Sequence, residues 1–177
     1  MVTVVVFEFG VMRCQPLRRA LCVWSKMKEI TKLAECFRSA IEISNIAEIL
    51  PVFKDFPQNC CEHASVFLGF YTSLIFPELE IVVVRGRNES IHGFQYHFWL
   101  EINGQVIDLT IDQFSEYSRA IYCENSHPLA VEFIEDSREQ IGVYMGNYYD
   151  KALDIKAFSK AMSSICCKLK YVGWEYA

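Results

Sequence analysis

The chain has 177 residues, of which 52% are hydrophobic and 14% aromatic, and its formal net charge is −5. This composition predicts a folded chain with a sizeable core and argues against intrinsic disorder. The negative balance, without a long basic run, argues against a nucleic-acid partner, because phosphate binding needs clustered lysine and arginine. The eight cysteines are too sparse for a disulfide scaffold, so we expect reduced thiols in a cytoplasmic protein.

The first ten residues are apolar, but Glu8 interrupts them and no basic segment precedes the apolar run. The run is too short to span a bilayer and does not fit a signal peptide, so we expect a buried strand without membrane attachment. Further along, apolar residues at helical spacing predict a helix over residues 26–44. A short helix that Pro51 ends is expected to follow it.

The remaining segments outside the central region predict strands, a loop and a closing helix. A buried strand is expected over residues 80–85 and a polar loop over residues 85–93. Two more strands are expected over residues 129–134 and 140–145. A closing helix is expected over residues 151–170. Its inward face is predicted to comprise Ala152, Ile155, Phe158, Met162, Ile165 and Cys166.

The most informative stretch is residues 95–112, which we interpret as a β-hairpin. Two runs rich in β-branched and aromatic residues flank Asn103 and Gly104. This dipeptide best supplies the two positive-φ positions of a type I′ turn. With such a two-residue loop, Trp99 lies opposite Asp108.

The hairpin register places His97 and Asp108 on one face, because successive side chains of a strand alternate between faces. The two residues lie diagonally across the strand pair, at a Cα separation of about 7–8 Å that both side chains can close. The opposite face is apolar and is expected to belong to the core; it comprises Phe98, Leu100, Ile102, Ile107 and Leu109. A solvated polar face is the ordinary interpretation of such a pair. A third partner upstream favours a site instead.

That partner is a cysteine pair at the start of a predicted helix over residues 59–71. Asn59 is a favourable N-cap, and Glu62 three residues later gives a capping-box pattern. Cys60 and Cys61 then occupy the first turn, where free N–H groups and the helix dipole favour a thiolate.

Two faces of this helix distinguish the two cysteines. Cys61, Ser65 and Gly69 recur every four residues and form a face of small side chains, which lets another backbone approach closely. The neighbouring face is apolar and comprises Cys60, Ala64, Phe67, Leu68 and Tyr71. We therefore favour Cys61 as the reactive thiol and keep Cys60 open as the alternative nucleophile.

A helix-start cysteine, a strand histidine and an aspartate on the paired strand are the groups that nucleophilic thiol catalysis needs. Three segments carry them: residues 59–65, Asn-Cys-Cys-Glu-His-Ala-Ser; residues 97–101, His-Phe-Trp-Leu-Glu; and residues 106–110, Val-Ile-Asp-Leu-Thr. These segments resemble the transglutaminase-like branch of the papain-like cysteine superfamily. That branch includes bacterial proteases, and the arylamine N-acetyltransferases are similar in their Cys-His-Asp layout.

The resemblance implies a cysteine-bearing helix packed against an antiparallel sheet. It implies Cys61 as nucleophile, His97 as base and acid, and Asp108 as the residue that orients the imidazole. The family often has glycine two residues before the nucleophile, where this chain has Asn59. Peptide or isopeptide hydrolysis, glutamine deamidation, transamidation and acyl transfer are all compatible with the resemblance.

Further residues near these segments have weaker signals. Trp99 shares the face of His97 and is a candidate cleft wall, or an ordinary packing residue. His92 is a second candidate for the cleft, whereas His63 and His127 are interpreted as a surface residue and a loop residue. A zinc site is a second class of hypothesis, with the donors Cys60, Cys61, His63 and His92. These donors lack CxxC or HxxxH spacing, so we expect no metal and no cofactor.

We therefore expect one α+β domain over residues 1–177. A strand and helical layer would occupy residues 1–50, a catalytic core residues 55–115, and a sheet edge with the closing helix residues 116–177. No oligomeric state is assigned. The expected function is that of a transglutaminase-like thiol hydrolase or acyltransferase acting on a peptide, protein or small amide or acyl substrate, with neither nucleic acid nor membrane as partner. The alternative is a non-catalytic protein-binding module that retains the same fold.

Overall fold

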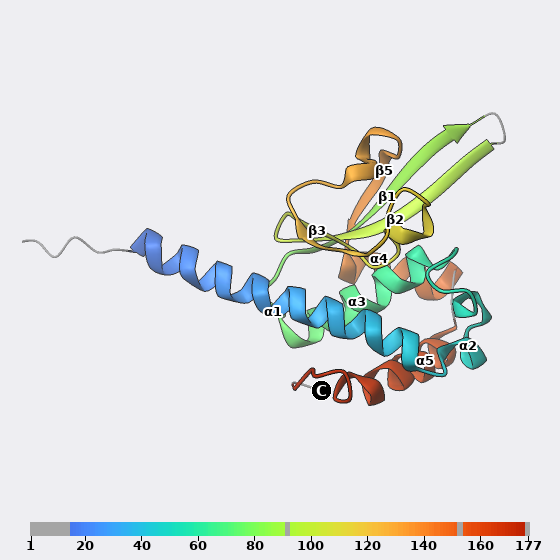
Figure 1. The fold of residues 1–177 in the computed structure, drawn as a ribbon, viewed down its shortest axis with the longest axis horizontal. Helices are drawn as coiled ribbons and strands as arrows, with labels where there is room; N and C mark the ends of the chain where they lie inside the picture. The colour runs from blue at the N-terminus through green and yellow to red at the C-terminus, as the bar shows by residue number, and fades with distance from the viewer. Residues whose placement is uncertain (1–14, 91–92, 152–153, 176–177) are drawn as a thin grey trace, which may run out of the picture.

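The structure, a computed structural model, describes residues 15–90, 93–151 and 154–175. These residues form the expected α+β fold, in which helices pack against an antiparallel sheet with strand order β4-β3-β2-β1-β5 (Figure 1). The strand expected over the first ten residues and the candidate cleft residue His92 lie outside the described residues. Within the described ranges, none of the helices combines the length and the apolar character needed to cross a bilayer.

Along the described residues, three α-helices come first, the five strands follow, and two α-helices come last. The α-helices are α1 (Gln15–Ile43), α2 (Ile46–Ile49), α3 (Cys61–Ile75), α4 (Ile141–Lys151) and α5 (Ile155–Leu169). The strands are β1 (Ile81–Ser90), β2 (Gly93–Ile102), β3 (Gln105–Asp108), β4 (Ile121–Glu124) and β5 (Ile134–Gln140). Three single turns of 3-10 helix are η1 (Pro51–Phe53), η2 (Ile111–Gln113) and η3 (Pro128–Val131).

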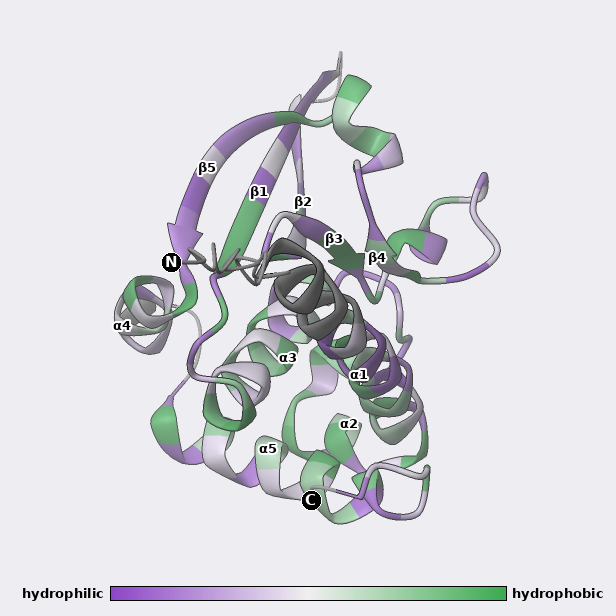
Figure 2. Cartoon of the chain, turned by 90° about the vertical axis from the view of Figure 1, so that its left-hand side faces the viewer, coloured by the Kyte–Doolittle hydropathy of each residue, from purple (hydrophilic) through white to green (hydrophobic). Residues whose placement is uncertain are grey.

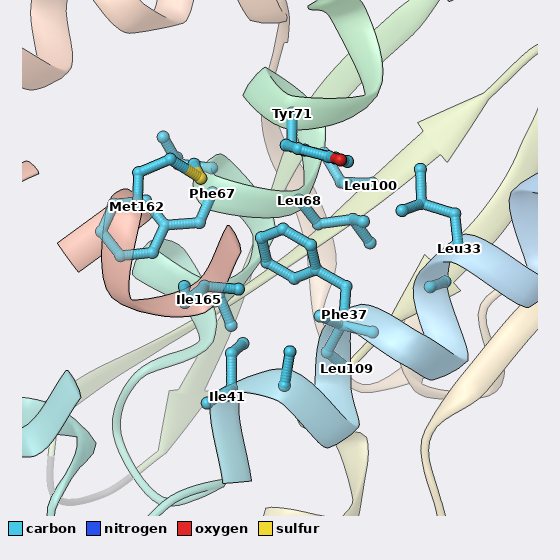
Figure 3. Close-up of a cluster of buried hydrophobic side chains, with 14 of the residues drawn as sticks. Leu33, Phe37, Ile41, Phe67, Leu68, Tyr71, Leu100, Leu109, Met162 and Ile165 are labelled. Carbon is cyan, nitrogen blue, oxygen red and sulfur yellow. The ribbon is translucent and has the colours of Figure 1, made fainter. Parts of the chain in front are cut away.

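The main core lies between one face of the sheet and the helices below it (Figures 1 and 2). Figure 3 shows how α1, α3 and α5 fill it together, with Phe37 and Phe67 both fully buried. Burying a side chain of this size contributes about 1.5–3 kcal/mol. The predicted inward face of the closing helix is confirmed at Phe158, Met162 and Ile165, which are buried, and is wrong at Ile155, which is 60% exposed in the first turn of α5. Core packing therefore fixes α3 against the sheet.

The predicted hairpin is confirmed in its turn and its register. Asn103 and Gly104 have φ angles of 48° and 75°, as a type I′ turn requires. Leu100 pairs with Ile107 across β2 and β3, the register expected for a two-residue loop. Because β3 ends at Asp108, the earlier part of β2 has no β3 partner. On the side of β3, the backbone of β2 at His97 therefore has no strand partner.

The polar loop expected over residues 85–93 is wrong, because β1 and β2 pair along their whole lengths as far as Ser90 and Gly93. This outer part of the hairpin extends beyond the helices (Figure 1). It therefore carries polar or exposed side chains although its backbone belongs to the sheet. Arginines lie over two of the exposed rings: Arg85 is 5.1 Å from the Tyr96 ring centroid and Arg87 4.8 Å from that of Phe94.

Two other strand predictions are also wrong. Residues 128–131 form η3 rather than a strand, and the true strand β5 follows as an exposed, mostly hydrophilic edge (Figure 2). An edge strand with no buried face has no apolar alternation to detect. Residues 140–145 begin helix α4 instead, because Ile141, Met145 and Tyr148 are buried at helical spacing.

Candidate active site

The backbone around the cysteine pair differs from the predicted capped helix. Helix α3 begins at Cys61, so Cys60 rather than Asn59 is its N-cap, and no side chain caps it. Asn59 instead has a φ of 56°, in the left-handed region where asparagine is among the few tolerated residues after glycine. Its backbone N–H faces the side-chain oxygen Oε1 of Gln113 at 3.4 Å. The left-handed turn therefore aims Cys61 at the sheet.

The predicted small face of α3 is confirmed where the helix meets β2. Ser65 Oγ donates to the Phe98 carbonyl at 3.3 Å. A Cβ atom at Gly69 would lie 3.1 Å from Leu100 Cδ2, closer than ordinary packing allows. Small residues thus let β2 approach α3 closely at Phe98 and Leu100.

The two cysteines have different surroundings. Cys60 is 1% exposed, and its thiol donates to the Pro57 carbonyl at 3.3 Å. Burial, together with the neighbouring Cys61 thiol, raises the pKa of Cys60 to about 12. Cys61 is 9% exposed, and its thiol is among the groups that raise the pKa of His97. The surroundings thus favour Cys61 over Cys60 as the nucleophile.

His97 and Asp108 form a fully buried pair. His97 Nε2 lies 2.6 Å from Asp108 Oδ2, and both side chains are 0% exposed. The other carboxylate oxygen, Oδ1, accepts from the backbone N–H of Thr110 at 2.8 Å and from its hydroxyl at 3.0 Å. An ionised carboxylate accepts hydrogen bonds and donates none, so donors on both oxygens favour a charged Asp108 that accepts a hydrogen bond from His97 Nε2–H.

In the folded protein the pKa of His97 is raised and the pKa of Asp108 is lowered. Burial by itself lowers the pKa of His97, but the charge of Asp108 and hydrogen bonds to Asp108 and Cys61 outweigh burial and raise it. Burial by itself raises the pKa of Asp108, but the positive charge of His97 and hydrogen bonds from His127 and His97 lower it. An imidazolium facing a carboxylate is the stable charge state of this pair.

On the side of His97 that faces away from Asp108, Nδ1 is the ring nitrogen that can exchange a proton with a thiol, because Nε2 is held by Asp108. The side-chain amide nitrogen of Gln113, at the end of η2, lies 3.2 Å from Nδ1. Nothing in the local sequence marks Gln113, since its position depends on the turn that follows β3.

The structure also brings in His127, which the sequence did not identify. This residue precedes η3 as expected of a loop, but it is buried, and its Nε2 lies 3.1 Å from Asp108 Oδ2. Its Nδ1 accepts from the backbone N–H of Leu129 at 3.2 Å. The Leu129 donor therefore fixes the tautomer: Nδ1 keeps its lone pair and Nε2 carries the proton that reaches Asp108.

Trp99 packs against the His127 ring on the face of the sheet opposite the helices. It is 3% exposed and packs with Val82, Val84 and Val106 in a small core on the far face of the sheet. Its ring stacks on that of His127 with centroids 4.2 Å apart. Burial makes Trp99 a packing residue here rather than an open cleft wall.

Among the described residues, three donors come together as a metal site would require: His97, Asp108 and His127, whose ligand atoms lie within 4.8 Å of one another. Their hydrogen bonds do not fit a metal. A metal on His127 Nε2 would force the proton onto Nδ1, where it would face the N–H of Leu129. The donors of the alternative zinc hypothesis do not form this group. His63 bonds the Tyr148 hydroxyl through Nδ1 at 2.8 Å instead of lying free at the surface.

Three comparisons with known proteins were made. Family models, curated proteins and solved structures were all searched, and none of them gave a match.

Proposed function

We propose that this chain is a thiol hydrolase or acyltransferase that attacks an amide or related acyl group through Cys61, His97 and Asp108. The observation that carries the proposal is the buried His97–Asp108 pair at 2.6 Å, with the Cys61 thiol among the groups that raise the pKa of the same imidazole. In such a pair the carboxylate holds the imidazole ring in one tautomer and one orientation.

Each residue has a role that follows from its contacts. Cys61 is the nucleophile, because it is the one member of the three with exposed surface; His97 and Asp108 are 0% exposed. His97 takes the thiol proton on Nδ1 and returns it to the leaving group. Asp108 accepts the hydrogen bond of the Nε2–H group and stabilises the charged ring. A substrate carbonyl therefore has to approach from the exposed side of Cys61.

The resemblance to transglutaminase-like enzymes supports the same assignment. The family often has glycine two residues before the nucleophile, and Asn59 stands there with a φ of 56°. Asparagine tolerates this left-handed conformation better than most residues other than glycine. Hydrolysis, deamidation, transamidation and acyl transfer all begin with the same thioester and remain the candidate reactions.

The proposal is tested by acylation with p-nitrophenyl acetate, followed by intact and peptide mass spectrometry. Wild type and Cys60→Ser are expected to form an acetyl thioester at Cys61, and Cys61→Ser is expected to form none. The two substitutions are matched because they make the same change at adjacent positions. If acetylation is absent, or spreads equally over exposed cysteines such as Cys167, the chain is a binding module and not an enzyme of this class.

A further inference from the structure

We infer that the outer edge of β2, beside Phe94 and Tyr96, is a docking site for a partner protein that adds an extended segment of its own chain to the sheet. The inference concerns an interaction surface and does not depend on the chemistry proposed for Cys61. Its basis is a strand edge that no described strand covers, next to two exposed aromatic rings.

The edge is uncovered because β2 is longer than β3. Strand β3 pairs with β2 only from Leu100 to Ile102, so none of the described strands covers this side of β2 between Gly93 and Trp99. On its other side, β2 pairs with β1 along its whole length. The outer half of β2 therefore has one covered and one uncovered edge, where the hairpin extends beyond the helices (Figure 1).

The pairing register determines which residues point their backbone groups toward the uncovered edge. In an antiparallel sheet, alternate residues of a strand direct their N–H and C=O groups to the same neighbour. Ile102 and Gln105 flank the two-residue turn and pair directly, so Ile102 faces β3. The same alternation along β2 directs Phe98, Tyr96 and Phe94 to this side.

The part of this edge that another chain can reach is short. At its inner end the Phe98 carbonyl already accepts from Ser65 Oγ at 3.3 Å. No described residue hydrogen-bonds to the outward backbone groups of Phe94 or Tyr96. These two residues thus offer two N–H and two C=O groups at the spacing of a strand, which is the pattern that an extended polypeptide complements.

The side chains beside the edge are apolar, as strand addition requires on one face. Phe94 and Tyr96 are 54% and 47% exposed and share the face of Phe98, because they lie two residues apart. The guanidinium groups of Arg87 and Arg85 lie over the two rings and favour this orientation. Exposed strand edges are usually blunted by charges, proline or a bulge, so an aromatic edge indicates an interaction site.

The size of the surface favours a short segment over a second copy of this chain. Two half-exposed rings offer only about 150–250 Å² of apolar surface, whereas a stable dimer buries about 1,200 Å² or more. In strand addition, main-chain hydrogen bonds supply the affinity and alternate side chains the specificity. The expected segment therefore carries apolar side chains at every second position, which pack on Phe94 and Tyr96.

The test starts from a phage-displayed library of random peptides, selected on the full chain carrying Cys61→Ser so that no thioester forms. The selected peptide is synthesised with a fluorescein label, and its Kd is measured by fluorescence anisotropy. Amide hydrogen exchange followed by NMR then locates it. We expect protection of the Phe94 and Tyr96 amides and no change at Gln95, whose N–H faces β1.

Two variants separate the backbone from the side chain. Tyr96→Ala keeps the N–H and loses the ring, and the Kd should rise at least about 10-fold. Tyr96→Pro also loses the N–H, which points away from β1, so no bond between the strands is lost. Its Kd should rise about 10-fold further. Tyr171→Ala is the matched control, because Tyr171 is 82% exposed beyond the end of α5, and it should bind like wild type.

N-methylation of the peptide tests the hydrogen bonds without altering the protein. Methyl groups on one set of alternate residues should abolish binding, and methyl groups on the other set should not, because a docked strand donates to β2 only at every second residue. Equal binding by both methylated peptides overturns the inference. So does a selection that yields no peptide, or one whose peptides protect amides elsewhere.

A second copy as the occupant would be visible in the protein alone. The amides of Phe94 and Tyr96 would then be protected without peptide and would lose that protection on dilution, which also overturns the inference. Failure of the proposed function is distinguishable, because wild type and Cys61→Ser should bind the peptide with the same Kd whether or not Cys61 can be acylated.

Discussion

His127 Nε2 lies 3.1 Å from Asp108 Oδ2, the same carboxylate oxygen that lies 2.6 Å from His97. One oxygen of a fully buried aspartate thus serves two imidazoles, while Thr110 supplies two donors to the other oxygen. Each additional hydrogen bond that Asp108 accepts stabilises the negative charge of the carboxylate. The carboxylate then attracts the proton of His97 less strongly. His127 is therefore a positioning residue that adjusts the basicity of His97 without facing Cys61 itself.

Replacing His127 separates this adjustment from simple packing. His127→Phe keeps a ring for Trp99 to stack on but removes the donor, so the pKa of His97 should rise further above its ordinary value. His127→Gln retains a donor near the position of Nε2 and should restore the wild-type pKa. The measurement is an NMR titration of the His97 ring in the three proteins. An unchanged His97 titration in His127→Phe would show that His127 only fills space.

Asp108→Asn tests the role of charge at constant size. The amide places an NH₂ group among donors, so the free energy of unfolding should fall by about 3–5 kcal/mol. Without the carboxylate, burial lowers the pKa of His97 unopposed, and the acylation rate of Cys61 should fall by about 10⁴-fold, as for a triad with the wrong tautomer.

The control for this substitution is Asp136→Asn, because Asp136 forms an exposed ion pair with Arg85. Exposed pairs contribute only about 0–1 kcal/mol, so both stability and acylation should stay near the wild-type values. Acylation by Asp108→Asn at the Asp136→Asn rate would remove Asp108 from the mechanism.

The pair also predicts how stability depends on pH. The pKa of His97 is raised on folding, so its contribution is complete below the unfolded value of about 6.5 and is lost as the pH rises through the folded value. The pKa of Asp108 is lowered on folding, so its contribution is complete above about 3.9 and is lost as the pH falls through the folded value.

The difference in unfolding free energy between wild type and Asp108→Asn should therefore be largest between about pH 4 and 6.5 and should decrease at alkaline pH. Urea denaturation across this range measures the difference. Comparing the two proteins cancels the contribution of His63, whose pKa is lowered by burial. A difference that stays constant from pH 4 to alkaline pH would contradict the charged pair.

The absence of a side chain at Gly86 lets Trp99 and Phe133 pack against the backbone of β1. Gly86 pairs with His97 across β1 and β2. A Cβ atom there would lie 2.8 Å from both Phe133 Cβ and the Trp99 ring. Gly86→Ala should cost about 1–3 kcal/mol of stability through overpacking and displace the ring that stacks on His127.

The matched substitution is Gly146→Ala in the middle of α4, where a Cβ atom meets nothing within 4 Å. This change should stabilise the protein by about 0.5–1 kcal/mol, because alanine is the better helix former. Thermal or urea denaturation of both variants decides the matter. A Gly86→Ala protein as stable as wild type would mean that Trp99 and Phe133 can yield at little cost.

Local patterns were enough to predict the parts of the site that lie on the hairpin. Asn103 and Gly104 set the turn, and the two-residue period of a strand then placed His97 beside Asp108. The small residues after Cys61 likewise predicted the close contact between α3 and β2. In each case the pattern that carries the prediction lies within one short segment of the sequence.

The parts that sequence could not supply depend on long-range contacts. Nothing near His127 shows that the chain returns to Asp108, 19 residues away. The capping-box prediction at Asn59 was wrong: Asn59 has a left-handed φ of 56°, and its backbone N–H donates to Gln113, 54 residues away. The strand β5 was missed because an exposed edge carries no apolar alternation.

The measurement that tests the central claim most directly is the pH dependence of iodoacetamide alkylation at each cysteine, followed by peptide mass spectrometry, in wild type and His97→Gln. We expect Cys61 to label fastest and to remain reactive at about pH 6, where ordinary thiols are almost fully protonated. We expect His97→Gln to lose that reactivity. Slow labelling of Cys61 that is insensitive to His97 would contradict the account.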